Sequence, residues 1–215
     1  MTSNELPQAF VFDAYGTLYD VHSVVQRCEA CWPGKGARLS QLWRAKQLEY
    51  TWQRSLMKRY APFSTVTREA LAYACEALRL ELSVAQMEGL MGEYQRLALY
   101  PDASRIENLR GKKAILSNGS PDMLLPLVEN SGLELDAVIS VDELKVYKPA
   151  PQVYALAEER LRTKDIGFVS SNCWDALGAK SYGFTVYWIN RAGAPLDRLG
   201  FKPDRVLSSL DEILQ

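Results

Sequence analysis

The sequence has a single histidine, His22, and contains no Gly-x-Ser-x-Gly segment. Serine hydrolases of the α/β type need a histidine base and that nucleophile turn, so their chemistry is not expected. No apolar run approaches the ~18 residues of a membrane span. The formal net charge is only -1 over 215 residues. We therefore expect no membrane insertion and no nucleic-acid partner.

The first residues also lack the positive region of a secretory leader, so a cytoplasmic location is expected. The four cysteines then read as free thiols. Cys28 and Cys31 form a lone Cys-x-x-Cys, without a second pair of ligands for zinc and without a strand leading into a redox helix. Neither a metal site nor a redox motif is predicted there, and the role of these two residues stays open.

Apolar residues make up 47% of the chain, enough for one core and a small second lobe. Strand patterns alternate with helix patterns outside residues 20–97, which predicts an α/β fold with a doubly wound, Rossmann-like parallel sheet. Strands are expected over 9–12, 113–117, 137–140, 166–170 and 185–189. Helices are expected over 121–130, 151–162 and 174–182. The predicted core domain comprises residues 1–19 and 98–215.

Residues 20–97 read as a helical cap lobe inserted after the first strand. Helices are predicted over 40–60, 67–80 and 83–99, with Ser40 and Ser83 as candidate caps. The predicted apolar stripe of the first of these helices contains Leu42, Trp43, Leu48, Trp52, Leu56 and Tyr60.

Asp13 directly follows the apolar run Ala9–Phe12, which places an acid at the carboxyl end of a buried strand. Ligands of open α/β sheets bind at that end, so Asp13 is the candidate nucleophile. Gly16 permits a tight turn, and Thr17 offers a hydroxyl to orient a neighbour. The alternative is an ordinary strand-end aspartate that caps a turn.

Two further predicted strands end in polar turns. Ser117-Asn118-Gly119-Ser120 follows one strand, and its amides and hydroxyls suit a carboxylate or phosphate oxygen, although such turns are common. Ser170-Ser171-Asn172-Cys173-Trp174-Asp175 follows another. It offers only one nearby acid, Asp175, which disfavours a dedicated Mg²⁺ site.

Two cations are candidates for the same site. Lys148 precedes a proline, which can aim its ammonium inward to keep Asp13 ionised; the alternative is a surface lysine. Arg44 lies among aromatic residues of a predicted helix, where it either binds an anion or is solvated. Tyr154 either reaches the same cluster or packs against the sheet.

The octet Phe12-Asp13-Ala14-Tyr15-Gly16-Thr17-Leu18-Tyr19 resembles the first motif of the haloacid dehalogenase superfamily, in which the aspartate forms an ester with the substrate. Phosphatases of that superfamily usually carry a second aspartate two residues later, which protonates the leaving alcohol. Tyr15 stands there, and a phenol with a pKa of about 10 is a poor acid at neutral pH. A halide leaving group needs no proton.

The Leu-Trp-Arg to Thr-Trp stretch, Ser-Asn-Gly-Ser-Pro, Val-Tyr-Lys-Pro and Ser-Ser-Asn-Cys-Trp-Asp-Ala extend the resemblance to the L-2-haloacid dehalogenases over nearly the whole chain. This resemblance implies a catalytic set of Asp13, Thr17, Arg44, Lys148, Tyr154, Ser170, Asn172 and Asp175. It implies carboxylate contacts from Ser117 and the amides of Ala14 and Tyr15, halide contacts from Arg44 and Asn118, and substrate contacts from Leu48, Phe63 and Trp174.

The implied reaction is hydrolysis of a short L-2-haloacid to a D-2-hydroxyacid and a halide ion, through an aspartyl ester with inversion at C2. The polar groups of Lys148, Asn172 and Asp175 are not ranked as activators of the hydrolytic water. No cofactor or metal is expected, and the resemblance implies a homodimer. The alternatives are a magnesium-dependent small-molecule phosphatase and a non-catalytic binding module on this fold.

Overall fold

A six-stranded sheet, in the order β3-β2-β1-β4-β5-β6, forms the centre of the molecule. All neighbouring strands are parallel. The computed structural model describes residues 6–214. Its strands are β1 (Ala9–Phe12), β2 (Lys112–Ser117), β3 (Ala137–Ser140), β4 (Ile166–Ser170), β5 (Thr185–Ile189) and β6 (Arg205–Leu207). The predicted doubly wound α/β sheet is confirmed.

The strand order places a topological switch point beside β1. The chain runs from β1 to β2 and β3 on one side, whereas β4, β5 and β6 lie on the other, so β1 pairs with both β2 and β4. Phe12 is level with Ile115 and with Val169 in these two ladders. The residues that follow β1, β2 and β4 therefore meet at one edge of the sheet, where ligands of such folds bind.

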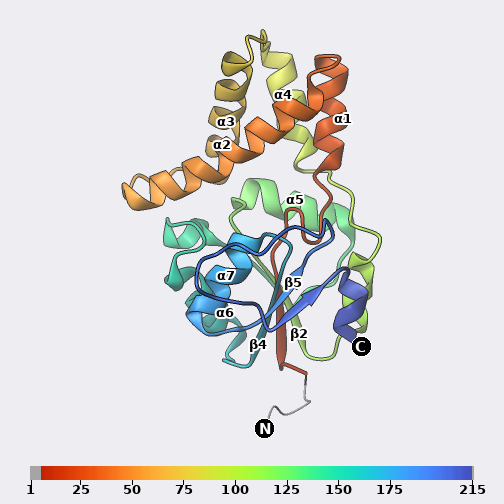
Figure 1. Ribbon diagram of the computed structural model, residues 1–215, viewed down its shortest axis with the longest axis vertical. Helices are drawn as coiled ribbons and strands as arrows, with labels where there is room; N and C mark the ends of the chain where they lie inside the picture. Colours follow the sequence, from red (N-terminus) through yellow and green to blue (C-terminus); the bar gives the residue numbers. More distant parts are fainter. Residues whose placement is uncertain (1–5, 215) are drawn as a thin grey trace.

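Helices flank the sheet and form a separate group at one end of the molecule (Figure 1). The flanking helices are α5 (Pro121–Ser131), α6 (Pro151–Leu161) and α7 (Cys173–Tyr182). The separate group comprises α1 (His22–Cys31), α2 (Gly36–Leu56), α3 (Phe63–Ala77) and α4 (Val84–Glu93). The two segments that join this group to the sheet pair with each other: Asp20 N–H donates to Ala98 O at 2.8 Å, and Tyr100 N–H donates to Leu18 O at 2.9 Å.

The start of α2 differs from the prediction. The helix begins at Gly36, so Ser40 lies inside it and is wrong as a cap. A side chain of α1 fixes this start, because the Glu29 carboxylate accepts the Gly36 N–H at 2.8 Å. The helix also ends at Leu56, four residues before Tyr60.

The buried face of α2 also differs from the predicted stripe. Its buried side chains include Leu39, Trp43, Gln47 and Thr51, so two polar residues face the interior. Leu56, which was expected on the apolar stripe, is 84% exposed. Apolar periodicity does not predict this face, because hydrogen bonds stabilise its buried polar side chains and apolar contacts are not the only interactions there.

The next two helices have shifted ends as well. α3 begins at Phe63, after Pro62, and ends at Ala77. Ser83 is confirmed as the cap of α4, with a capping box to Gln86, but that helix ends at Glu93. The short strand β6 and the 3-10 helices η1 (Ala103–Asn108), η2 (Val141–Leu144) and η3 (Leu210–Leu214) were not predicted.

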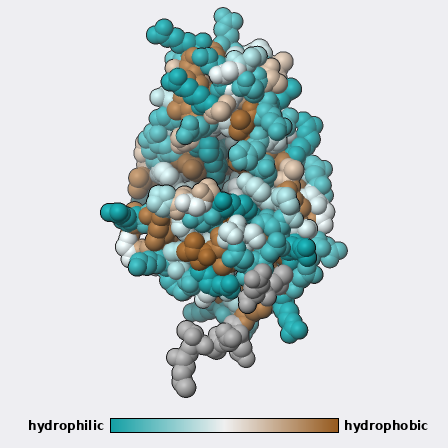
Figure 2. Space-filling view, turned by 45° about the vertical axis from the view of Figure 1, so that its right-hand side comes forward, coloured by the Kyte–Doolittle hydropathy of each residue, from teal (hydrophilic) through white to brown (hydrophobic). Residues whose placement is uncertain are grey.

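Two observations concern the surface and the thiols. None of the helices described for residues 6–214 is long and apolar enough to cross a membrane. On the face in Figure 2, hydrophilic side chains predominate and apolar ones form separate patches. All four cysteines are free, and burial raises the pKa of the Cys28 thiol to about 12.

Candidate active site

Asp13 ends the ladder between β1 and β4, where its N–H donates to Val169 O at 2.9 Å. Its side chain is nearly buried and accepts three hydrogen bonds. Oδ1 accepts from Lys148 Nζ at 3.1 Å, and Oδ2 accepts from Thr17 Oγ1 at 3.0 Å and Asn172 Nδ2 at 2.8 Å. These donors stabilise the carboxylate and hold it in one orientation.

Lys148 places a cation between two buried carboxylates. Its Nζ also lies 2.8 Å from Oδ2 of Asp175, and its side chain has no solvent exposure. Burial would lower the pKa of this ammonium, but the charges of Asp13 and Asp175 raise it above its usual value. Lys148 therefore stays charged, and the loop preceding α6 brings it into the site and not to the surface.

Asp175, on the first turn of α7, is fully buried. Burial raises the pKa of its carboxyl to about 6, against the opposing effect of the Lys148 ammonium. Tyr154 Oη donates to Oδ1 at 2.9 Å, and Ser170 Oγ donates to Oδ2 at 3.2 Å. The pKa of Tyr154 is raised well above its usual value by burial and by the Asp175 charge, so the phenol keeps the proton that it donates.

The turns after β1 and β4 are joined directly. The Ser171 N–H donates to Thr17 Oγ1 at 2.8 Å, and Asn172 Nδ2 also reaches Tyr15 O at 3.2 Å. Thr17 and Asn172 therefore connect the turn after β1 to the loop that leads into α7.

Arg191, just beyond β5, was not among the predicted site residues. Its guanidinium donates to Thr17 O at 3.1 Å, to Ser171 Oγ at 3.0 Å and to Gly16 O at 3.3 Å. It also forms an ion pair with Asp102 at 2.9 Å. The only sequence signal for Arg191 is its position after the carboxyl end of a strand. Of the segments that follow predicted strands, only the polar turns after other strands were predicted to form part of the site.

The turn after β2 presents donors at the same edge of the sheet. Ser117 Oγ accepts the Gly119 N–H at 3.0 Å, which leaves its own proton for a ligand. Asn118 Oδ1 accepts the Lys148 N–H at 3.0 Å, which leaves the amide NH₂ as a donor. Within residues 6–214, the amides of Ala14 and Tyr15 donate to no other protein group. Such a set suits an anionic ligand.

Tyr15 lies between the sheet and the α1–α4 group. Its ring centroid is 5.9 Å from that of Phe63 on α3 and also 5.9 Å from that of Tyr94. Its hydroxyl is buried without a hydrogen-bond partner in the described chain. Burial raises the pKa of this phenol, which makes it a still weaker acid than a free tyrosine.

Arg44 and Leu48 of α2 line a pocket of about 630 Å³ together with Asn172 and Trp174. His22 and Arg191 lie on the same pocket. Arg44 Nη1 donates to Gln47 Oε1 at 2.6 Å. The pocket therefore combines a cation and apolar walls from the helical group with the loop that holds Asp13.

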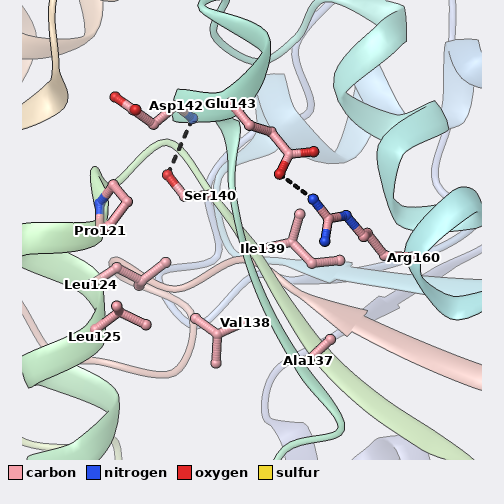
Figure 3. A pocket seen from close by; sticks show the side chains of 10 residues that line it. All are labelled: Pro121, Leu124, Leu125, Ala137, Val138, Ile139, Ser140, Asp142, Glu143 and Arg160. Atoms are coloured by element: carbon pink, nitrogen blue, oxygen red, sulfur yellow. Dashed lines mark hydrogen bonds and ion pairs between the residues drawn. The ribbon is translucent and has the colours of Figure 1, made fainter.

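Another pocket, of about 290 Å³, lies along β3 between α5 and α6 (Figure 3). Of its charged residues, Glu143 pairs with Arg160 and Asp142 pairs with Lys145 outside the pocket lining. The pocket contains none of the predicted site residues. Among the residues that the structure describes, no group of three or more His, Cys, Asp or Glu side chains is placed to hold a metal ion.

Comparison with known proteins identifies a family for this chain. The family model of haloacid dehalogenase-like hydrolases matches residues 7–183. The (S)-2-haloacid dehalogenase of Pseudomonas sp. strain YL is 47% identical, over 97% of this chain and 93% of the relative. Haloacetate dehalogenase H-2 of Moraxella sp. strain B is 46% identical, over 96% of each chain.

A solved structure is also similar: the L-2-haloacid dehalogenase from Xanthobacter autotrophicus with chloropropionic acid covalently bound. It has a TM-score of 0.90 and 43% identity, with 97% of each chain covered. Shared sequence over almost the full length and a shared fold lead to one conclusion: this chain belongs to the haloacid dehalogenase-like hydrolases and, within them, to the (S)-2-haloacid dehalogenases.

Proposed function

We propose that this chain hydrolyses short L-2-haloacids, such as haloacetates and L-2-chloropropionate, to D-2-hydroxyacids and halide ions. The observation that carries the proposal is the environment of Asp13, a nearly buried carboxylate that Lys148, Thr17 and Asn172 hold by hydrogen bonds. A carboxylate held in this way by a cation and neutral donors is oriented for nucleophilic attack.

The first step is a displacement at C2 of the substrate. An Asp13 oxygen forms a bond to C2 on the face opposite the halogen, while the carbon–halogen bond breaks and its electron pair leaves with the halide. Arg44 and the amide NH₂ of Asn118 receive the negative charge as it develops, which stabilises the transition state more than the substrate.

The substrate carboxylate binds at the turns after β1 and β2. The hydroxyl of Ser117 and the amides of Ala14 and Tyr15 are the donors available to it. Leu48 and Trp174 contact the alkyl part from the pocket wall. Phe63, which packs against Tyr15, completes this apolar surface.

The second step is hydrolysis of the ester. Water adds to the side-chain carbonyl carbon of Asp13, and the bond from this carbon to the ester oxygen breaks. That oxygen stays bonded to C2 and takes one proton of the water to become the product hydroxyl. The Asp13 carboxylate is regenerated with one oxygen from water, and the second proton passes to solvent. Asp175, Tyr154 and Ser170 keep Lys148 in place throughout, because they form the buried hydrogen-bonded set behind its ammonium.

The phosphatase alternative is disfavoured by the same site. A phosphate ester needs a proton for its leaving alcohol, and the residue two positions after the nucleophile is Tyr15, whose pKa burial raises. The protein's own ammonium, Lys148, balances Asp13 and Asp175. Phosphate release from a panel of phosphoesters, measured with and without magnesium, would overturn the dehalogenase proposal if it exceeded halide release.

The decisive experiment uses both enantiomers of 2-chloropropionate. Chloride release from the L enantiomer alone, with D-lactate as product, is expected. Over repeated turnovers in ¹⁸O-labelled water, label should enter the carboxylate of Asp13, and Asp13→Asn should abolish turnover. Label confined to the product after a single turnover would contradict the ester.

We also propose that residues 20–97 act as a cap over a core of residues 1–19 and 98–215. The hydrogen bonds between Leu18 and Tyr100 and between Asp20 and Ala98 support these boundaries, because the chain leaves and returns through one paired connection. Limited proteolysis should produce cuts within the cap before cuts in the core strands; the reverse order would argue against the division.

A homodimer is the proposed assembly. Leu56 and Leu199 are 84% and 61% exposed and line an apolar groove of about 460 Å³ with Trp52 and Trp174. A second copy packed on this face would remove it from water. Light scattering should give twice the 24.2 kDa chain mass. Leu56→Lys should lower that mass, and a monomeric wild type would refute the proposal.

A cytoplasmic location is proposed from the four free thiols, because reducing compartments keep cysteines unpaired. Fractionation of the source cells should place the dehalogenase activity with the cytoplasmic fraction, and recovery in an oxidising compartment would contradict this.

A further inference from the structure

Arg44 carries a charge that no acidic side chain neutralises. Among the ion pairs of residues 6–214, none includes Arg44, although it lies on α2 beside the pocket that contains Asn172. Its Nη1 instead donates to the neutral amide of Gln47, at 2.6 Å from Oε1. Gln47 is fully buried. Glutamine side chains are usually exposed, so its burial calls for hydrogen-bond partners in the interior.

The neighbours of Gln47 fix which end of its amide faces Arg44. Thr67 Oγ1 donates its proton to Phe63 O at 2.7 Å, so it can only accept from Gln47. Gln47 Nε2 donates to that oxygen at 2.7 Å. The amide oxygen of Gln47 must then point to Arg44. Thr67 is itself held in place, because its backbone carbonyl accepts a hydrogen bond from Trp43 Nε1 at 2.8 Å.

We propose that Gln47 is a positioning residue for halide release: it holds the guanidinium of Arg44 at the pocket that Arg44 lines with Asn172 and Trp174, without neutralising its charge. The inference rests on the proposed role of Arg44 in receiving the halide. A carboxylate at position 47 would reach Arg44 equally well, but it would form an ion pair and weaken the attraction for a departing anion. A neutral acceptor gives orientation and leaves the full positive charge.

The first test separates charge from orientation. Gln47→Glu keeps an acceptor beside Arg44 but adds a negative charge, whereas Gln47→Met keeps the size and removes the acceptor. Inhibition by added chloride and bromide should weaken about 10- to 100-fold in Gln47→Glu, the range for a lost charged hydrogen bond. In Gln47→Met the weakening should be smaller. The kcat for 2-chloropropionate should fall in both variants with little change in KM.

Gln53→Glu is the matched control. It adds the same charge to the same helix, but Gln53 is exposed and bonds only to Glu49, at 2.9 Å. Halide inhibition and kcat should stay as in the wild type. Circular dichroism and thermal unfolding establish whether each variant is folded. If either Gln47 variant fails to fold, Thr67→Val removes the anchor of Gln47 while leaving Arg44 and Gln47 intact, and it should weaken halide inhibition in the same direction.

Arg44→Met distinguishes failure of this inference from failure of its premise. If Arg44→Met loses halide inhibition and the folded variants at Gln47 and Thr67 retain it, the positioning role of Gln47 is wrong. If Arg44→Met itself retains halide inhibition, Arg44 does not receive the halide, and the premise is wrong while the dehalogenase reaction stands. Equal effects of Gln47→Glu and Gln53→Glu would also overturn the proposal.

Discussion

Lys148 Nζ lies 2.8 Å from Asp175 Oδ2, in a position with no solvent exposure on either side chain. The same ammonium reaches Asp13 at 3.1 Å. The cation that pairs with the Asp13 carboxylate is therefore buried in the core, and its own side chain is shielded from water. This arrangement differs from a surface ion pair, whose contribution to stability is small.

Lys148→Met should leave two buried carboxylates without their cation. We expect activity to fall at least about 100-fold and the free energy of unfolding to fall by about 3–5 kcal/mol. Lys145→Met is the matched control, because Lys145 pairs with Asp142 at 2.6 Å but is 59% exposed. Its effect on unfolding should stay below about 1 kcal/mol in urea titrations. Similar losses in both variants would show that burial of Lys148 adds nothing.

The raised pKa of Asp175 predicts a pH dependence for activity. Its carboxyl must be ionised to hold Lys148, so kcat/KM should fall as the pH drops through about 6. A rate that is constant well below this pH would contradict the role of Asp175.

The same raised pKa predicts that stability changes with pH in the opposite direction to activity. Between pH 3.8 and about pH 6, the Asp175 carboxyl keeps its proton in the folded state and releases it in the unfolded chain. The contribution of this carboxyl is complete below 3.8 and is lost as the pH rises toward about 6. The unfolding free energies of the wild type and Asp175→Asn should be compared across this window. As the pH rises, the free energy of unfolding of the wild type should fall relative to that of the variant.

Gly119→Ala should disturb the substrate carboxylate contacts. A Cβ at this position would lie 2.9 Å from Cε2 and 3.0 Å from Oη of Tyr15, a ring that is itself buried. Displacement of the ring or the turn by part of an ångström should reduce kcat/KM by up to about 100-fold. Gly92→Ala is the control, since its nearest contact is the flexible end of Arg96 at 3.2 Å. Unchanged kinetics in Gly119→Ala would mean that the turn tolerates movement.

Arg191→Met should lower kcat although Arg191 does not reach Asp13. Without the guanidinium, the carbonyls of Gly16 and Thr17 lose their shared donor, and the hydroxyl that orients Asp13 Oδ2 becomes more mobile. Arg191→Lys should restore only part of the rate, because an ammonium cannot reproduce the planar fork. Arg68→Met, at an exposed pair with Glu88, serves as the control. Full activity in Arg191→Met would rule out this positioning role.

The core of the candidate site could be predicted because its residues follow strands. The ranges 9–12, 137–140, 166–170 and 185–189 are strands with the predicted bounds. Each is a short apolar run with a polar or glycine-containing segment behind it, and parallel pairing then brings the ends of β1, β2 and β4 together. The proposed roles of the individual side chains come from the resemblance to the family and not from the strand pattern.

The α1–α4 group was harder to predict. Apolar periodicity placed Leu56 inside and gave no signal for Gln47, because a buried amide depends on partners such as Thr67 that lie on another helix. β6 was missed because it has only three residues, of which Val206 is exposed. In both cases the structure depends on contacts between different helices or strands. A single sequence does not show these contacts.

In the proposed reaction the attacking oxygen comes from the sheet side, and the anion receptor combines Asn118 of the sheet side with Arg44 of the helical group. These two parts are joined by the paired segments at Leu18–Tyr100 and Asp20–Ala98. Breaking the carbon–halogen bond therefore requires both parts together, whereas ester hydrolysis draws on groups behind Asp13 that belong to the sheet side alone. A substitution in α2 that slows the first step should leave the second at its normal rate, so the two half-reactions can be tuned separately.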